Sequence, residues 1–239
     1  MWRMNYTIIR NLDVLPKLLE TMHRMTDPNS DATEEERYNH VRYIVSLMHK
    51  KGHIRTEAFG LENLPEEGGY VMYPNHQGKY DAYGIVGVHE KPCSVVMDRE
   101  KSYYVLIDEI IRTLNGKRMD IHDPRQGLRI INQMAEEVAQ GRRYIIFPEG
   151  GYAPNQKNTL GEFKPGSFKA AVKAKAPIVP VVLYDSWKVF NSWQLTPVTS
   201  QVHFLEPIVY EQYQNLKTVE IAALVKERIQ RKIDEISGK

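Results

Sequence analysis

The stretch that decides the fold is Tyr70-Val71-Met72-Tyr73-Pro74-Asn75-His76-Gln77-Gly78-Lys79-Tyr80-Asp81, a short apolar run that ends in polar residues. Four apolar residues bounded by Gly69 and Pro74 are typical of a buried β-strand. The same pattern returns downstream in four more short apolar runs, at residues 94–97, 144–147, 178–184 and 202–210. These five runs are the predicted strands.

Helix-length segments lie between and after these runs. Residues 126–140 have helical spacing and stop at Gly141, residues 167–175 form a shorter segment, and residues 216–236 form a long closing one. Strands that alternate with helices favour a parallel sheet buried on both faces. The sequence therefore predicts an α/β fold with a largely parallel central sheet flanked by helices.

An amphipathic helical pair is predicted before the first strand. Residues 5–25 carry apolar side chains at helical spacing and are interrupted at Pro16. Thr33 and Glu36 have the spacing of a capping box, which opens the second helix. We expect residues 1–52 to form a helical segment and residues 53–239 to form the α/β domain. The apolar stripes would pack on the core or dip into a membrane surface.

Composition limits the possible classes of protein. The 239 residues include 42% hydrophobic and 26% charged side chains, which indicates a globular domain. The net charge of only +2 argues against a nucleic-acid-binding protein. No apolar run is long enough to span a bilayer, and no signal peptide is recognisable at the start. The one cysteine, Cys93, lies in an apolar run and is expected to be a buried thiol rather than a nucleophile.

The residues that follow the first predicted strand can carry acid–base chemistry. His76 and Asp81 lie five positions apart. If a helix begins after Gly78, the carboxylate can fold back onto one imidazole nitrogen and leave the other free as a base. Such a pair is weak evidence by itself, because chance supplies about 0.3 of them in a chain of this composition. A packed histidine and an unrelated surface aspartate are the alternative.

Further motifs follow in order along the chain. The strand at residues 144–147 runs into Pro148-Glu149-Gly150-Gly151, and Phe163-Lys164-Pro165-Gly166 opens a helix. Glycine lets backbone approach a ligand closely, and Lys164 at a helix start favours an anion. A strand bracketed by prolines, Pro177-Ile178-Val179-Pro180-Val181, completes the series.

These four motifs resemble, in the same order, those of the glycerolipid acyltransferase family, and among its members most closely the lysophosphatidic acid acyltransferases. The similarity covers about residues 50 to 210. The resemblance implies that His76 is the general base and that Asp81 orients it. His76 would take the proton of a glycerol hydroxyl as that oxygen attacks an acyl thioester, with no covalent acyl-enzyme. Asn75, Glu149, Gly150 and Lys164 would contribute to substrate binding.

The chain departs from the family pattern at its basic residues. The family commonly has Thr-Arg where this chain has Gly151-Tyr152, and its acceptor-binding arginine would fall near Ile121. We therefore expect Arg118 or Arg125 to bind the phosphate from a shifted position, with Lys117 or Arg99 assisting. The alternative is that these are solvated surface charges.

The resemblance also implies the partners. The acyl donor would be acyl-CoA or an acyl-carrier-protein thioester, the acceptor a lysolipid, and no cofactor or metal would be bound. The enzyme would lie on the inner face of the cell membrane, in the cytoplasm. The apolar face of the N-terminal amphipathic segment would insert into the membrane surface. Its side chains are those of Tyr6, Ile8, Ile9, Leu12, Leu15, Leu18 and Leu19. The same chemistry on another lipid acceptor, or a non-catalytic lipid-binding role, are the alternatives.

Overall fold

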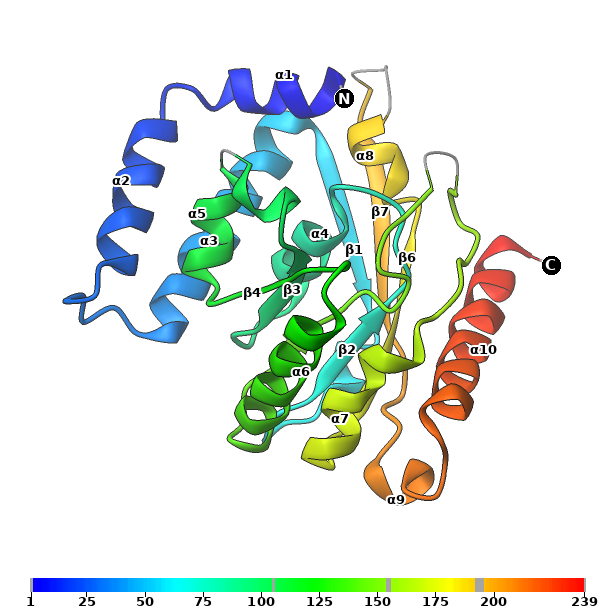
Figure 1. Ribbon diagram of the computed structural model, residues 1–239. Helices are drawn as coiled ribbons and strands as arrows, with labels where there is room; N and C mark the ends of the chain where they lie inside the picture. Colours follow the sequence, from blue (N-terminus) through cyan, green and yellow to red (C-terminus); the bar gives the residue numbers. More distant parts are fainter. Residues whose placement is uncertain (1, 105, 154–155, 192–195, 239) are drawn as a thin grey trace.

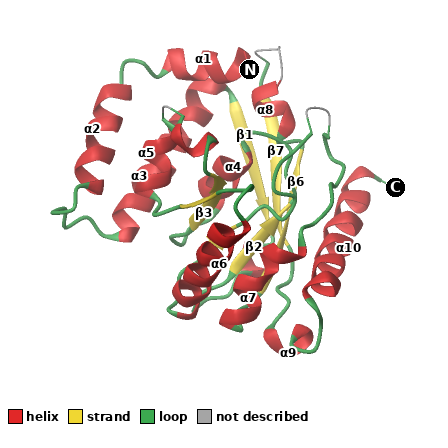
Figure 2. Cartoon of the chain, viewed as in Figure 1, coloured by secondary structure: helices red, strands yellow, loops and turns green. Residues whose placement is uncertain are grey.

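The computed structural model describes residues 2–104, 106–153, 156–191 and 196–238, and within them the strands form a seven-stranded sheet in the order β1-β7-β6-β2-β5-β3-β4. The strands are β1 (Ile54–Phe59), β2 (Val71–Pro74), β3 (Ser94–Asp98), β4 (Lys117–Met119), β5 (Tyr144–Ile145), β6 (Ile178–Tyr184) and β7 (Val198–Phe204). The helices around it (Figure 1, Figure 2) are α1 (Trp2–Arg10), α2 (Leu15–Thr26), α3 (Glu34–Gly52), α4 (Asp81–Val88), α5 (Ile107–Thr113), α6 (Pro124–Ala139), α7 (Lys169–Ala174), α8 (Trp187–Asn191), α9 (Tyr210–Tyr213) and α10 (Thr218–Ser237).

Helices cover both faces of the sheet. Val71 and Tyr73 belong to the apolar cluster formed with α6, α7 and α10, whereas Met72 between them belongs to the cluster formed with α2, α3, α4 and α5. Burial on both faces explains why β2 is apolar at successive positions rather than at alternate ones. The predicted α/β class, with a central sheet flanked by helices, is confirmed.

The sheet is largely but not wholly parallel. β6, β2, β5, β3 and β4 run in one direction, as their pairings show. β7 pairs with β6 in the antiparallel sense, and β1 pairs with β7 in the parallel sense. β1 and β7 therefore run opposite to the other strands and extend the sheet away from the centre.

Most predicted elements are present, with shifted ends. The strand predicted over residues 202–210 is β7, which begins at Val198 and ends at Phe204. Residues 205–210 lie outside it, contrary to the prediction. β5 is shorter than predicted and ends at Ile145, although the N–H of Ile146 still donates to the carbonyl oxygen of Met72 at 3.0 Å. β1 and β4 were not predicted, since their alternation is short and carries charged side chains such as Arg55 and Lys117.

The N-terminal residues form two short helices rather than one interrupted helix. α1 ends at Arg10 and α2 begins at Leu15, so the interruption comes before Pro16. Pro16 lies in the first turn of α2, where a missing N–H costs nothing. The predicted capping box of α3 is confirmed, because Glu36 N–H donates to Thr33 Oγ1 at 3.2 Å and Thr33 N–H donates to Glu36 Oε2 at 2.8 Å.

The N-terminal helices lie against the rest of the chain (Figure 1). Arg3 is buried, with 1% of its surface exposed, and donates to the carbonyl oxygens of Gly52 at 3.1 Å and Thr196 at 2.7 Å. It thereby joins α1 to the end of α3 and to the segment before β7. The domain boundary at residue 52 stays a prediction. Within the described residues, no helix combines the length and the apolar character needed to cross a bilayer.

The buried side chain of His89 links α3 to the start of β2. Because it is buried, we expect the folded protein to become less stable as the pH falls. His89 is 0% exposed, its Nδ1 lies 3.2 Å from Tyr38 Oη, and its Nε2 lies 2.7 Å from Tyr70 Oη. Burial lowers its pKa to about 4, from an ordinary value near 6.5. Below pH 6.5 this histidine is therefore protonated in the unfolded chain, whereas in the folded chain it stays neutral until the pH approaches 4. The free energy of unfolding falls as the pH falls from 6.5 toward 4.

We expect this histidine to cost the wild-type protein about 2 kcal/mol of unfolding free energy between pH 7 and pH 5. Urea unfolding at both pH values measures the loss. His89→Gln should be less stable at pH 7 because the two tyrosine contacts are disturbed, but its stability should change less with pH. An equal loss in both proteins would contradict the assignment.

Candidate active site

Three segments meet at one edge of the sheet. β2 lies between β6 and β5, and all three are parallel, so their carboxyl ends point to the same side. The residues that follow them include His76 after β2, Glu149 after β5 and Ser186 after β6. Ligands of open α/β sheets bind beyond these strand ends.

The predicted histidine–aspartate pair is formed. α4 begins at Asp81, so the chain turns back after Gly78 and brings the carboxylate under the imidazole. His76 Nδ1 lies 2.7 Å from Asp81 Oδ2, and Asp81 is 0% exposed. Because Asp81 occupies Nδ1, Nε2 is the nitrogen left to act on a substrate. This is the arrangement of a base and its orienting carboxylate.

Buried hydrogen-bond donors surround the Asp81 carboxylate. Oδ2 also accepts the backbone N–H groups of Gln77, at 2.5 Å, and of Gly78, at 2.9 Å. Ser186 Oγ–H donates to Oδ1 at 2.6 Å. These donors offset the cost of burying the Asp81 carboxylate.

Aromatic rings set the position of the imidazole. Phe147 stacks on His76 with ring centroids 4.1 Å apart, and Tyr152 meets it edge-on at 4.6 Å. The His76 side chain keeps 18% of its surface exposed, so the ring is held but still reachable. Burial and the nearby Asp81 carboxylate raise the pKa of Tyr152. Phe147 and Tyr152 lie in the motif after β5, but sequence reasoning did not assign them to the imidazole.

Glu149 is turned toward the backbone of the histidine segment. Its Oε1 accepts the N–H of His76 at 2.8 Å, and its Oε2 accepts the N–H of Gly161 at 2.8 Å and the amide of Gln156. Burial raises the pKa of the Glu149 carboxyl, although these donors act in the opposite direction. Glu149 thus links the loop of residues 156–161 to the residue that bears the imidazole. Its predicted contact with substrate stays a prediction.

Asn75 is engaged with the neighbouring strand. Its Nδ2 donates to the carbonyl oxygen of Leu183 at 3.0 Å, and its Oδ1 accepts the N–H of Leu183 at 2.7 Å. The side chain therefore continues the β2–β6 pairing beyond Pro74. This pairing holds the start of the histidine segment against β6.

Gly150 and Lys164 are neighbours beside the histidine segment. Gly150 has a φ of +69°, and a Cβ there would lie 2.6 Å from Lys164 Nζ, so only glycine fits without a shift of the lysine. The N–H of Lys164 donates to the carbonyl oxygen of Pro148 at 2.8 Å. The structure thus brings these two predicted residues together, with the Lys164 side chain exposed.

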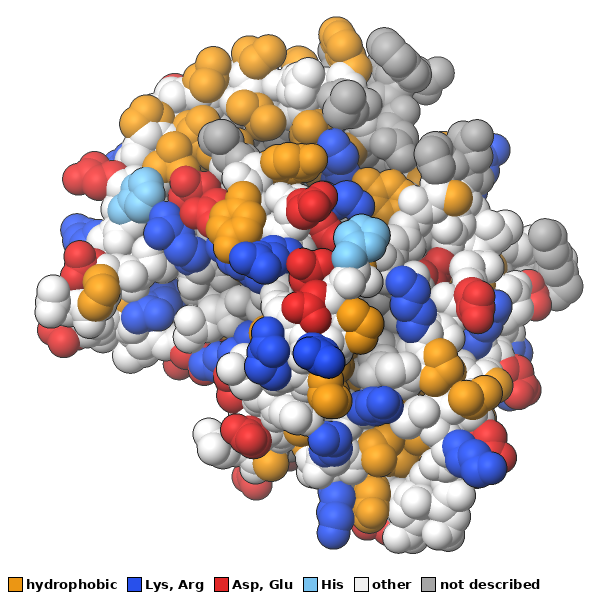
Figure 3. Space-filling model, viewed as in Figure 1, with side chains coloured by type: hydrophobic (Ala, Val, Ile, Leu, Met, Phe, Trp, Pro, Cys, Tyr) orange, Lys and Arg blue, Asp and Glu red, His pale blue; other side chains and the backbone are white. Residues whose placement is uncertain are grey.

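The other predicted cations have different surroundings. Lys117 lies 2.5 Å from Glu137, and Arg118 lies 2.7 Å from Asp108 and stacks over Tyr103. Arg125 is exposed at the start of α6, where Lys and Arg side chains gather over α6 and α7 (Figure 3). Ion pairs with protein carboxylates thus engage Lys117 and Arg118, and their predicted contact with a phosphate stays untested.

Cys93 is 2% exposed, as expected for a structural thiol, and burial raises its pKa to about 12, which keeps it protonated. In the described part of the chain no three or more His, Cys, Asp or Glu side chains are grouped to hold a metal ion. The predicted absence of a metal and a cofactor stays a prediction.

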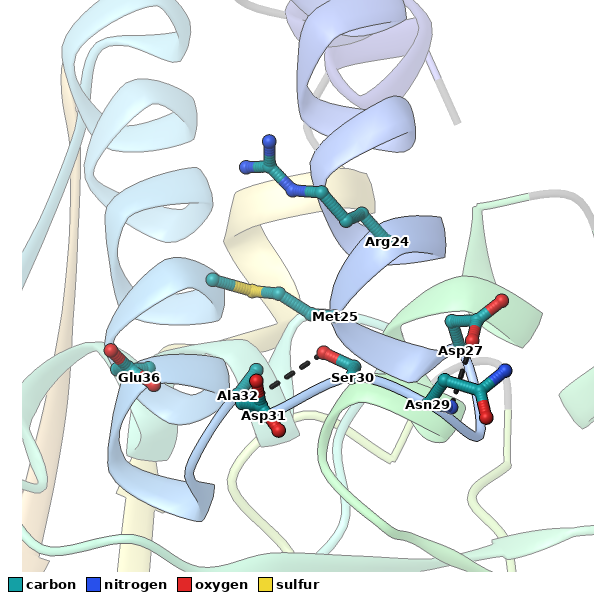
Figure 4. A pocket seen from close by; sticks show the side chains of 8 residues that line it. All are labelled: Arg24, Met25, Asp27, Asn29, Ser30, Asp31, Ala32 and Glu36. Atoms are coloured by element: carbon teal, nitrogen blue, oxygen red, sulfur yellow. Dashed lines mark hydrogen bonds between the residues drawn. The ribbon is translucent and has the colours of Figure 1, made fainter.

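A separate surface depression lies where α2 turns into α3 (Figure 4). It is lined by Arg24, Met25, Asp27, Asn29, Ser30, Asp31, Ala32 and Glu36. The bonds drawn there are local turn contacts, from Asn29 N–H to Asp27 Oδ1 at 2.8 Å and from Ala32 N–H to Ser30 Oγ at 3.2 Å. None of the motif residues lines it.

Comparison with known proteins places these motifs in a family. Residues 55–184 match the sequence profile described as Acyltransferase. The chain belongs to the acyltransferase family. His76, Asp81, Glu149 and Lys164 lie inside the matched region of this chain, whereas Ser186 lies just beyond it.

Several curated acyltransferases are similar to the chain. The 1-acyl-sn-glycerol-3-phosphate acyltransferase of Pseudomonas aeruginosa is 30% identical over 144 residues, which are 60% of this chain and 54% of that protein. The enzyme of the same name from Saccharomyces cerevisiae is 26% identical over 189 residues, covering 76% of this chain and 60% of that one. The chain thus spans about half to three fifths of the length of these relatives.

A solved acyltransferase shares the whole fold. The 1-acyl-sn-glycerophosphate acyltransferase of Thermotoga maritima aligns with a TM-score of 0.77, over 100% of this chain and 99% of that one. The two sequences are 19% identical, so the likeness concerns the fold alone.

Proposed function

We propose that this protein is an O-acyltransferase that moves a fatty acyl group from a thioester donor to the free hydroxyl of lysophosphatidic acid. The product would be phosphatidic acid, a precursor in phospholipid biosynthesis. The observation that carries the proposal is the hydrogen bond of His76 to Asp81 at the carboxyl end of β2, in a chain of the acyltransferase family. The names of the curated relatives support the choice of acceptor.

The proposed reaction uses His76 as the base. Nε2 takes the proton from the acceptor hydroxyl while the hydroxyl oxygen attacks the thioester carbonyl carbon. Asp81 holds the ring by Nδ1 and stabilises the imidazolium that forms. When the tetrahedral intermediate collapses, the C–S bond breaks, and the leaving thiolate takes the proton back from the imidazolium. An ester and a free thiol result, without a covalent acyl-enzyme.

Lys164 is the cation that we propose for the acceptor phosphate. It is exposed and lies against Gly150, next to the segment that holds His76. Arg125 at the start of α6 is a second candidate. Lys117 and Arg118 would have to leave their carboxylate partners to reach a ligand. Tyr152, which occupies a family arginine position, gives a reason to test other lysolipids as acceptors.

We propose that the protein acts at a membrane surface, on the cytoplasmic side of the cell membrane. Trp2, Ile9 and Leu12 are 46%, 63% and 54% exposed, and hydrophobic side chains gather over α1 (Figure 3). Trp2 and Ile9 lie on α1 and Leu12 lies in the turn after it, and exposed apolar side chains grouped in this way are suited to a lipid interface. Leu18 was predicted to face the membrane as well, but it is only 7% exposed and packs inward. The prediction is therefore wrong for Leu18.

The experiment is an acyl-transfer assay with vesicle-bound acceptors. Purified protein is given acyl-CoA or an acyl-carrier-protein thioester, with a panel of lysolipids, and thiol release and product lipid are measured. We expect lysophosphatidic acid to give the highest rate. The Ile9→Ser/Leu12→Ser variant should lose activity on vesicles and keep it on acceptors dispersed in detergent.

The outcome decides between the proposed activities. Preference for another lysolipid would replace the acceptor and keep the chemistry. Lipid binding without thiol release from any donor would overturn the enzymatic proposal in favour of a lipid-binding role.

A further inference from the structure

Ser186 lies next to the catalytic segment although the sequence places it far away. It follows β6 by two residues, and β6 pairs in parallel with β2, with Val181 opposite Pro74. Parallel neighbours end at the same edge of the sheet. The turn after β6 therefore comes to lie beside the segment after β2, which bears His76.

The Ser186 hydroxyl contacts the buried carboxylate directly. Its Oγ lies 2.6 Å from Asp81 Oδ1 and 3.0 Å from Gln77 Oε1. A serine hydroxyl has one hydrogen to donate, and the bond to a charged acceptor is the stronger one. Ser186 is 2% exposed and Asp81 is 0% exposed, so water competes little for this bond.

The two oxygens of Asp81 have separate partners. Oδ2 receives His76 Nδ1 and the N–H groups of Gln77 and Gly78, all from the catalytic segment itself. Oδ1 accepts the hydroxyl hydrogen of Ser186, which lies in the turn after β6. A carboxylate held at both oxygens resists rotation about its Cβ–Cγ bond. Without the hydroxyl, Oδ1 would lose this buried donor, and the orientation of Oδ2 toward the imidazole would be less restricted.

Other contacts hold the turn in place without the hydroxyl. Gln77 accepts the N–H of Trp187 at 3.3 Å and donates to the carbonyl oxygen of Leu183 at 2.8 Å. Asn158 Oδ1 accepts the N–H of Asp185 at 2.9 Å and the amide of Gln77, also at 2.9 Å. The backbone on both sides of Ser186 is thus anchored, and removal of one hydroxyl should leave the turn where it is.

We propose that Ser186 is a positioning residue for acyl transfer, whose hydroxyl fixes the Asp81 carboxylate so that Oδ2 faces His76 Nδ1. This inference rests on the proposed function. Ser186 Oγ contacts Asp81 and Gln77 rather than His76, and the hydroxyl therefore acts through Asp81. It lies outside the matched family region of residues 55–184, and the structure alone brings it to the site.

The test compares Ser186→Ala with Ser186→Thr, which keeps the hydroxyl. Loss of a hydrogen bond to a charged group predicts that Ser186→Ala lowers kcat about 10- to 100-fold with little change in KM. Ser186→Thr should recover a large part of the rate. The matched control is Ser94→Ala, because Ser94 is equally buried and donates to the carbonyl oxygen of Leu114 at 2.7 Å, at the start of β3.

A second readout needs no substrate. The NMR signal of the His76 Nδ1 proton reports its bond to Asp81 in the free protein. We expect Ser186→Ala to shift or broaden this signal, and Ser94→Ala to leave it unchanged. This result would support the positioning role even if the acceptor proved to be a different lipid. An unchanged signal in Ser186→Ala, or wild-type kcat in an active enzyme, would overturn the inference.

Discussion

His76→Ala is expected to lower kcat for acyl transfer about 100- to 10,000-fold, which is the usual contribution of a general base. The variant lacks the group that takes the acceptor proton, and Asp81 cannot replace it because its carboxylate is buried below the ring. Thiol release from the donor in the presence of lysophosphatidic acid measures the loss. Binding of the acceptor should change much less than kcat.

Two controls separate chemistry from folding in this variant. His203→Ala removes a different histidine, which lies on β7 and stacks on Phe59 at 4.5 Å, and it should keep most of the activity. Added imidazole should restore part of the rate of His76→Ala, since the space between Phe147 and Tyr152 would admit the free base. Full activity of His76→Ala without imidazole would rule out the proposed mechanism.

Asp81→Asn is expected to lower kcat by about 1,000-fold or more, by comparison with the same change in serine-protease triads. Asparagine has the same shape, so its oxygen can still accept from His76 Nδ1 and from the N–H groups of Gln77 and Gly78. What it lacks is the negative charge that stabilises the imidazolium. If the amide turns the other way, it presents a donor to Nδ1 and favours the wrong tautomer.

The rate of Asp81→Asn is compared with that of Asp234→Asn, whose aspartate lies on α10 and accepts from Gln230 at 2.8 Å. Thermal unfolding of both variants reports whether the fold is kept. The double variant His76→Ala/Asp81→Asn should be little slower than His76→Ala, because the two residues act as one unit. A fully active Asp81→Asn would mean that the charge of Asp81 takes no part in catalysis.

The strands and helices near the site could be predicted from the sequence because each depends on local pattern. β2 and β6 are short apolar runs bounded by glycine or proline, and α6 has helical spacing and ends before Gly141. The edge strands β1 and β4 could not be predicted, because they lack such a local pattern. β1 is partly exposed and β4 is three residues long, so neither has the apolar run that a buried strand requires.

The pairing of His76 with Asp81 could also be predicted, since both belong to one short segment and only the turn at Gly78 had to be assumed. The surroundings of the pair could not. Ser186 is 105 residues from Asp81, and Glu149 is 73 residues from His76. Their contacts depend on the strand order β6-β2-β5, which does not follow the order along the chain.

The sequence by itself thus determined the α/β class, the family and the pairing of His76 with Asp81, because these depend on local patterns and ordered motifs. Only the tertiary structure decided which groups hold that pair and which cations are engaged elsewhere. Lys117 and Arg118 were predicted from the sequence to contact the acceptor phosphate, yet they lie in ion pairs with Glu137 and Asp108. The physical reason is that a buried carboxylate or a cation takes its partners from whatever the packing of distant strands and helices brings within hydrogen-bond distance.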